Sequence, residues 1–112
     1  MVLRNNAKPI FIHNKLFNTR AAAKRYIQYI VKNEKLNQPI SDENKEFVNA
    51  ILEYHPYCKD KIGCGVEYIF VRINPEYGRN REFCIKRIDG SIEDFSWHYS
   101  IKENYEERNE NA

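Results

Sequence analysis

The chain has 112 residues, of which 42% are apolar and 13% aromatic, and its 18 Lys and Arg side chains nearly balance 16 Asp and Glu. This length suits one compact domain, and the aromatic side chains can build its core, which argues against a disordered chain. No run approaches the roughly 18 apolar residues of a membrane-spanning helix, and residues 1–8 resemble neither a secretory signal nor a transit leader. We therefore expect a cytoplasmic protein with no membrane partner.

Charge is distributed unevenly along the chain. Residues 102–112 hold four Glu against one Lys and one Arg, a net charge of −2, which leaves +4 on residues 1–101. We expect residues 1–101 to form a single α+β domain and the acidic segment 102–112 to be a frayed tail. The modest positive excess is compatible with binding a phosphate backbone but does not require it.

The first predicted elements are a strand and an amphipathic helix. Residues 9–17 are mostly apolar, and Asn14-Lys15 either turns a two-stranded ribbon there or ends one strand; we expect an N-terminal strand. Thr19 is a good N-cap, and apolar residues then recur at helical spacing. These apolar positions are Ala23, Ile27, Ile30 and Val31.

The opposite side of this first helix is basic. Arg20, Lys24 and Lys32 are spaced by multiples of four, with Gln28 between them and Arg25 beside them. Such a stripe is typical of a solvated helix face, and it is also one candidate surface for binding nucleic acid.

A second amphipathic helix is predicted next. Pro39 stops the first helix, Ser41 is placed to cap the second, and two carboxylates in its first turn favour the helix dipole. His55-Pro56 ends it, because a proline disfavours helical geometry in the preceding residue. Its apolar face consists of Phe47, Val48, Ile51 and Leu52.

Three strands complete the prediction. Residues 66–73, 81–88 and 92–97 are rich in β-branched and aromatic side chains. Asp89-Gly90 predicts a tight hairpin between the second and third of these strands. We therefore predict an α+β fold with an N-terminal strand, two amphipathic helices and a three-stranded antiparallel meander.

Alternation along the predicted strands divides the sheet into two faces. Ile69 and Val71 fall on one face, and Tyr68, Phe70 and Arg72 fall on the other. If the helices cover the first face, the second is either a platform that stacks bases or a second core layer under the N-terminal strand. The candidate nucleic-acid-binding residues of this platform and its margins are Tyr68, Phe70, Arg72, Arg79, Arg81, Lys86, Trp97 and His98.

Catalysis is not predicted. The residues that could act as acids, bases or nucleophiles show no recognisable spacing, and they are His13, His55, His98, Asp60, Asp94, Cys58, Cys64 and Cys84. The glycines of Gly63-Cys64-Gly65 are interpreted as a fold feature that allows positive φ or a close backbone approach. We expect reduced cysteines and no catalytic residue, metal or cofactor, with a metal-dependent nuclease built on Asp94 and His98 as a minor alternative.

Several motifs together resemble one family. Residues 61–71, Lys-Ile-Gly-Cys-Gly-Val-Glu-Tyr-Ile-Phe-Val, are continued by Asn74-Pro75 and closed by Asp89-Gly90 and Asp94-Phe95-Ser96. With Ser41-Asp42-Glu43 and His55-Pro56 upstream, these motifs are similar to the DCL (defective chloroplasts and leaves) domain family. The resemblance extends over about residues 10–101.

The resemblance implies an RNA-linked role without a known catalytic site. The family includes a plastid protein implicated in ribosomal RNA maturation, the C-terminal region of the largest subunits of the RNA polymerases for gene silencing, and small bacterial and phage members. It carries over no established functional residue. Relatives commonly follow Asp-Phe-Ser with an aromatic and two basic residues, whereas this chain has Trp97-His98-Tyr99, which would weaken a phosphate contact there.

Two functions are predicted. The first is a small RNA- or nucleic-acid-binding accessory module, linked to RNA processing or transcription, that uses either the helix stripe of Arg20, Lys24 and Lys32 or the sheet platform. The alternative is a protein-interaction module of a phage or bacterium that docks on a host protein complex through exposed aromatic side chains.

Overall fold

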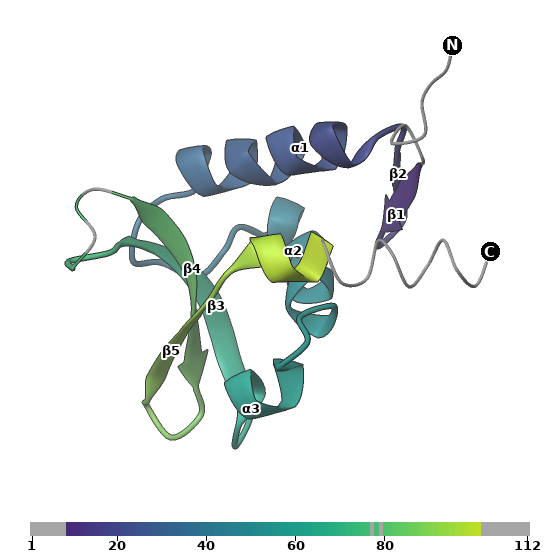
Figure 1. Ribbon diagram of the computed structural model, residues 1–112. Helices are drawn as coiled ribbons and strands as arrows, with labels where there is room; N and C mark the ends of the chain where they lie inside the picture. Colours follow the sequence, from purple (N-terminus) through teal and green to yellow (C-terminus); the bar gives the residue numbers. More distant parts are fainter. Residues whose placement is uncertain (1–8, 77, 79, 102–112) are drawn as a thin grey trace, which may run out of the picture.

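The computed structural model describes residues 9–76, 78 and 80–101, and it has the predicted α+β fold (Figure 1). An N-terminal hairpin precedes helices and a three-stranded antiparallel sheet, and residues 97–101 form a final helical turn. The elements are β1 (Ile10–Ile12), β2 (Lys15–Phe17), α1 (Arg20–Asn33), α2 (Asp42–Glu53), α3 (Cys58–Ile62), β3 (Val66–Ile73), β4 (Arg81–Arg87) and β5 (Ile92–Phe95). The predicted tail, residues 102–112, lies outside the described residues. None of the helices in the described part is long and apolar enough to cross a membrane.

The N-terminal segment is a hairpin, so the two-stranded alternative is correct and the single expected strand is wrong. β1 and β2 pair with Ile10 opposite Phe17 and Phe11 opposite Leu16. His13 has a φ of +54°, as tight hairpin turns require. Ile10 and Phe17 are buried in the core, whereas Phe11 and Leu16 are more than half exposed.

The first helix forms as its sequence predicts. The Thr19 side chain accepts a hydrogen bond from the N–H of Ala22 at 3.0 Å, which caps α1. The four predicted apolar positions of this helix are buried.

The second helix begins where predicted, but its cap differs. Ser41 makes no capping bond within α2, and its hydroxyl instead donates to the carboxylate of Glu34 at 2.6 Å. That carboxylate also accepts from the N–H of Ser41 and from the side-chain amide of Asn44. Burial opposes its ionisation, but these hydrogen bonds outweigh burial and lower the pKa of Glu34. Glu34 therefore joins the end of α1 to the start of α2.

The short helix α3 follows α2 and was not predicted.

The sheet has the predicted order and direction. β3, β4 and β5 are antiparallel neighbours, and Ile69 lies opposite Ile85. These side chains share one core with the buried faces of α1 and α2, which cover one face of the sheet (Figure 1). β5 ends at Phe95, so the third strand is shorter than predicted and Trp97 begins the final helical turn.

Residues 36–40 cover the outer edge of β3. The N–H of Asn37 donates to the carbonyl of Val71, and the N–H of Ile40 donates to the carbonyl of Ile69, both at 2.8 Å. This segment therefore satisfies backbone groups that an edge strand would otherwise expose.

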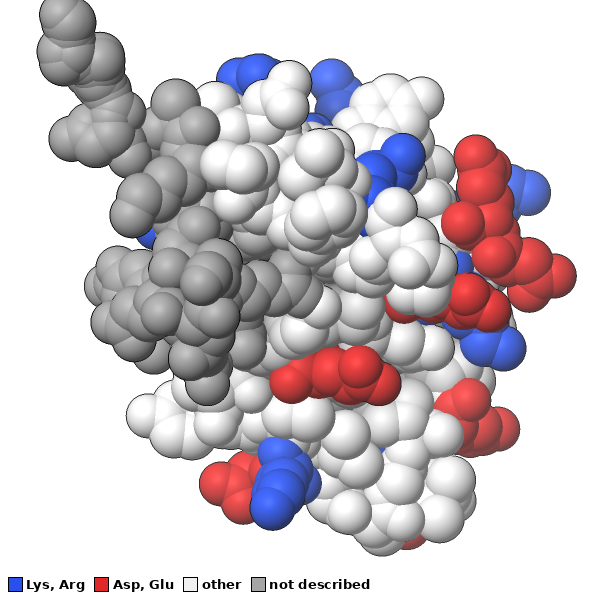
Figure 2. Space-filling view, turned by 90° about the vertical axis from the view of Figure 1, so that its right-hand side faces the viewer, with Lys and Arg blue, Asp and Glu red and all other residues white. Residues whose placement is uncertain are grey.

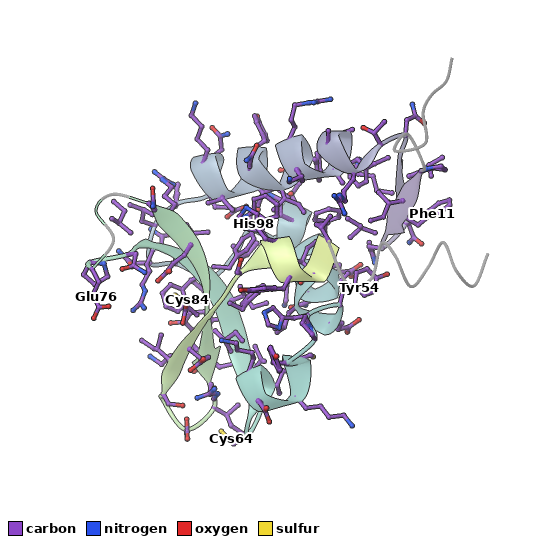
Figure 3. All side chains as sticks on the ribbon, in the orientation of Figure 1. Phe11, Tyr54, Cys64, Glu76, Cys84 and His98 are labelled. Atoms are coloured by element: carbon purple, nitrogen blue, oxygen red, sulfur yellow. The ribbon has the colours of Figure 1, made fainter. Side chains whose placement is uncertain are left out.

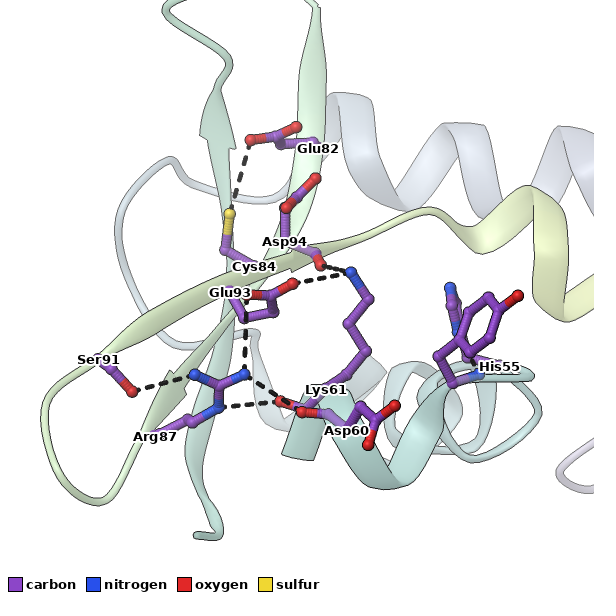
Figure 4. Close-up of polar contacts among 10 residues, drawn as sticks. His55, Asp60, Lys61, Glu82, Cys84, Arg87, Ser91, Glu93 and Asp94 are labelled. Carbon is purple, nitrogen blue, oxygen red and sulfur yellow. Dashed lines mark hydrogen bonds and ion pairs between the residues drawn. The ribbon is translucent and has the colours of Figure 1, made fainter. Parts of the chain in front are cut away.

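The Gly63-Cys64-Gly65 motif joins α3 to β3 and confirms the fold-feature interpretation. Gly63 has a φ of +57°, and a Cβ there would lie 2.9 Å from Nε of Arg87. The Arg87 guanidinium occupies this space because it donates to the carbonyl of Lys61 at 3.0 Å and to the hydroxyl of Ser91 at 3.2 Å (Figure 4). These contacts hold α3 against the hairpin of β4 and β5.

Candidate nucleic-acid interface

The outer face of the sheet is not the open aromatic platform that alternation predicts. Phe70 is only 7% exposed, and its ring packs edge-on against Tyr68 with centroids 6.0 Å apart. Pro39 lies beside Phe70 at the edge of β3. A buried ring cannot stack on a base, so the prediction for Phe70 is wrong, although Tyr68 is only half-buried. The alternative of a core layer under the N-terminal strands also fails, because the hairpin lies at the far end of the molecule from the sheet (Figure 1).

The charged groups of this face are paired with one another. Nε of Arg72 donates to Glu82 at 2.8 Å, and this hydrogen bond is the main cause that raises the pKa of Arg72. Cys84 is fully buried beside Glu82 and lies opposite Asp94 (Figure 4). Burial raises the pKa of the Cys84 thiol to about 12, so the thiol stays protonated. Arg72 therefore offers little uncompensated charge to a phosphate.

Arg81 is used inside the fold. Its guanidinium donates to the carbonyl oxygens of Val31 and Glu34, both at 3.1 Å. The last carbonyls of a helix lack partners within the helix, so Arg81 ties the C-terminal end of α1 to β4. Arg79 lies outside the described residues. Lys86 lies on the outer sheet face and forms no ion pair within the described part of the chain.

Trp97 and His98 lie beside α1 rather than extending a platform on the sheet. Trp97 is only 8% exposed, so the prediction that it presents a stacking surface is wrong, because the final helical turn carries it into the core. His98 stacks on its indole with centroids 3.7 Å apart. Burial, and then the positive charge of Lys24, lower the pKa of His98, so this imidazole is neutral at pH 7. The basic stripe of α1 and the margin of the predicted sheet platform therefore meet where Lys24 approaches His98.

The outer side of α1 carries positive charge that no acidic residue of the same helix compensates. The helix contains four basic residues and neither Asp nor Glu. Arg25 and Lys32 are exposed and Lys24 is partly exposed, and none of these three forms an ion pair with another described residue. Figure 2 shows Lys and Arg along the upper edge of the molecule, where Figure 1 places α1, and Asp and Glu mainly below and to the right. This side of α1 is thus basic, although Arg20 and Lys24 of the predicted stripe are only partly exposed.

Tyr29 lies among these cations and was not predicted as a site residue. It is 65% exposed, with Arg25 four residues before it and Lys32 three residues after it, so the three side chains share one helix face. Tyr29 also borders a groove of about 560 Å³ between α1 and residues 35–44. The signal was present in the sequence, because Tyr29 falls at a basic rather than an apolar position of the helical pattern.

Residues 28–101 match the family described as "Protein of unknown function (DUF3223)". The chain belongs to this family. It is 39% identical over 61 residues to "Protein DCL homolog, chloroplastic" of Arabidopsis thaliana, an alignment covering 54% of this chain and 28% of that protein. It is also 39% identical over 64 residues to DNA-directed RNA polymerase V subunit 1 of the same plant, covering 56% of this chain and 3% of that subunit. The chain thus spans less than a third of the length of these relatives. These matches confirm the predicted resemblance to the DCL family.

A solved structure shares the fold of this DUF3223 domain. The solution NMR structure of an uncharacterized protein from Rhodospirillum rubrum matches it with a TM-score of 0.72 and 32% sequence identity. The match covers 84% of this chain and 88% of that protein.

The motifs that carry the resemblance hold the DUF3223 fold together. Nζ of Lys61 donates to Glu93 at 2.9 Å (Figure 4). This contact adds to those of Arg87 in holding α3 against the hairpin of β4 and β5. His55 is buried, and its Nδ1 accepts the N–H of Tyr57 at 3.0 Å. Burial, and then the charge of Lys61, lower the pKa of His55, so its ring is neutral at pH 7. The visible roles of these residues are therefore structural.

The described part of the chain also contains no cluster of three or more His, Cys, Asp and Glu side chains that could hold a metal ion. His13 lies 3.3 Å from a carboxylate oxygen of Glu46, at the hairpin. Asp94 and His98, the residues of the nuclease alternative, are accordingly not members of such a cluster.

Proposed function

We propose that this DUF3223 domain is a non-catalytic accessory module that binds RNA through the outer side of α1. The observation that carries the proposal is a helix with four basic residues, no acidic residue and an exposed tyrosine among the cations. Exposed Lys and Arg bind phosphates and release the counterions that surround a nucleic acid. Such a surface needs no further chemistry to hold an RNA strand.

The relatives support an RNA-linked setting. A matching segment lies within a subunit of an RNA polymerase, an enzyme that makes RNA, and another lies within a chloroplastic DCL homolog. A basic domain carried by such an enzyme would be close to its transcript. For this chain we propose a corresponding accessory role in RNA processing or transcription.

The outer sheet face is the weaker of the two candidate surfaces. Arg72 is neutralised by Glu82, Arg81 is bound to α1, and Phe70 is buried. Tyr68 and Lys86 alone make a smaller contact than the row of cations on α1.

The proposal is tested by titrating a fluorescent RNA with the intact chain and with Lys24→Gln, Arg25→Gln and Lys32→Gln. Each variant removes one charge, so each should weaken binding and reduce the slope of log K against log salt by about 0.7. Lys59→Gln, at an exposed position of α3, is the matched control and should leave the affinity unchanged. If the three α1 variants bind RNA as the wild type does, α1 is not the contact surface.

A second candidate function, protein docking, is favoured by the hairpin. Phe11 and Leu16 lie directly opposite each other on β1 and β2 and are 56% and 51% exposed. Figure 3 labels Phe11 on the hairpin. Ile10, Ile12 and Phe17 of the same strands already supply the core, and this outer pair is not part of the core of the described residues. Exposed apolar pairs of this kind are frequent in protein interfaces.

This second candidate predicts that the domain recovers one protein from RNase-treated lysate of its own cells. The paired substitution Phe11→Ser and Leu16→Ser should abolish that recovery while leaving RNA binding unchanged. Loss of RNA binding, or undiminished recovery of the protein, would argue against docking through the hairpin.

A further inference from the structure

We infer that the ligand of the α1 surface is single-stranded RNA, and that Tyr29 is the residue on which one of its bases stacks. This inference rests on the proposed function, and it deepens that proposal by naming the form of the RNA. It is carried by the position of one aromatic ring and of the groove beside it.

Tyr29 is placed for contact rather than for packing. Its 65% exposure is the highest among the large exposed apolar side chains of the described residues. Its ring stacks on no other ring in the described part of the chain. The buried face of α1 is completed by Ala23, Ile27, Ile30 and Val31, so the core does not use Tyr29.

Cations flank this ring on both sides along the helix. Arg25 lies one turn before Tyr29 and Lys32 lies about one turn after it. Two phosphates of a strand that runs along the helix could therefore be neutralised while the base between them lies against the ring. Aromatic rings within a basic surface are the usual arrangement in proteins that hold single strands.

The groove beside Tyr29 offers hydrogen-bonding groups to the edge of that base. It is lined on one side by Tyr29 and Asn33 of α1 and on the other by Gln38 and Asn44. Side-chain amides both donate and accept hydrogen bonds, so they suit the edges of bases. Asn33 and Asn44 already donate one hydrogen bond each, to the carbonyl of Tyr29 and to the carboxylate of Glu34, which leaves their amide oxygens and the side chain of Gln38 for the base. The carboxylates of Glu34 and Glu43 and the single cation Lys35 also line the groove, so it has no excess of positive charge for a further phosphate.

Double-stranded RNA cannot use the exposed ring of Tyr29 or the groove beside it. Its bases are stacked on one another, and side chains cannot enter the deep, narrow major groove of double-stranded RNA. A ring that projects from a helix would meet only sugars and phosphates there. Single strands splay their bases, and each base stacked on an aromatic side chain contributes substantially to affinity.

The inference is tested by measuring the affinity of Tyr29→Ala and Tyr29→Phe for an oligouridine of about 12 nucleotides and for an RNA duplex of mixed sequence. Tyr29→Ala should weaken single-strand binding about tenfold or more and leave duplex binding unchanged, whereas Tyr29→Phe should retain both. Tyr57→Ala, at a tyrosine that is 62% exposed at the start of α3, is the matched control. The fluorescence of Trp97, the single tryptophan, reports whether each variant is folded.

The outcomes separate this inference from the proposed function. If Tyr29→Ala binds the single strand as the wild type does, or loses affinity for both RNAs equally, Tyr29 does not stack and the inference is wrong. The charge variants of α1 then show whether the phosphate contact itself remains. If Arg25→Gln and Lys32→Gln also bind normally, the proposed function fails as well.

Discussion

A guanidinium nitrogen of Arg81 lies 3.1 Å from the carbonyl oxygen of Val31, although the two residues are 50 positions apart in the sequence. With the matching bond to Glu34, this contact fixes the end of the basic helix to the second strand of the sheet. A residue predicted to bind phosphate therefore helps to hold the basic helix α1 in place.

Substitution of Arg81 should affect stability before it affects binding. Arg81→Gln removes a charged donor from two helix carbonyls, and we expect a loss of about 1–3 kcal/mol in the free energy of unfolding. Urea denaturation monitored by Trp97 fluorescence measures this loss. Under conditions in which it is folded, Arg81→Gln should still bind RNA with nearly wild-type affinity. A large loss of affinity in the folded variant would show that Arg81 contacts RNA itself.

Gly63 should tolerate no side chain. Gly63→Ala imposes a positive φ on alanine and places its Cβ against Arg87, so we expect a loss of at least about 1–3 kcal/mol in unfolding free energy. Gly90 is the matched control, because its φ is +90° but nothing lies within 4 Å of a Cβ there. Gly90→Ala should therefore lose less stability in the same urea experiment. Equal losses would mean that the contact with Arg87 is unimportant.

Local signals in the sequence predicted much of this fold, because their causes lie within a few residues. Thr19 caps α1 through a bond to Ala22, and Asp89-Gly90 forms the hairpin between β4 and β5. The five residues of α3 are too few to show a helical period, so this helix was missed.

The site was harder to predict, because the exposure and pairing of its side chains depend on contacts between distant segments. Alternation correctly placed Phe70 opposite the core face, but it could not show that this ring would be buried, with Tyr68 packed edge-on against it. The pairing of Arg72 with Glu82 likewise depends on the register of β3 against β4. Helical spacing places Arg25 and Lys32 on the outer face of α1, whereas Lys24 lies at the margin of this face, beside His98.

The stability of the domain should decrease as the pH falls below about 6.5. Burial lowers the pKa of His55 in the folded state, so the unfolded chain binds a proton at this position before the folded chain does. The stabilisation is complete above the ordinary histidine pKa and is lost as the pH falls toward the lowered value. His98, whose pKa is also lowered, contributes in the same direction.

Urea denaturation at a series of pH values measures this effect. His55→Asn keeps an oxygen that can accept the N–H of Tyr57 but does not titrate, so its stability should vary less with pH. The remaining slope of the unfolding free energy against pH should decrease further in the double variant with His98→Asn. A wild type whose stability is constant from pH 7.5 to about pH 5 would contradict this prediction.

The cysteines should differ in reactivity. Cys64 is exposed, whereas Cys84 is fully buried with a pKa of about 12. Iodoacetamide should therefore modify Cys64 in the folded protein and Cys84 only after unfolding, because the thiolate is the reactive form. Mass spectrometry of the digested protein assigns each modification. Rapid labelling of Cys84 in the folded state would show that the outer sheet face opens.

The most direct test of the binding surface is an NMR titration of the intact, ¹⁵N-labelled chain with single-stranded RNA. We expect the largest amide shift changes on α1 around Lys24, Tyr29 and Lys32, with smaller changes near His98. Changes concentrated on β4 and β5, or on the hairpin of Phe11 and Leu16, would contradict the assignment of α1 as the RNA-binding surface.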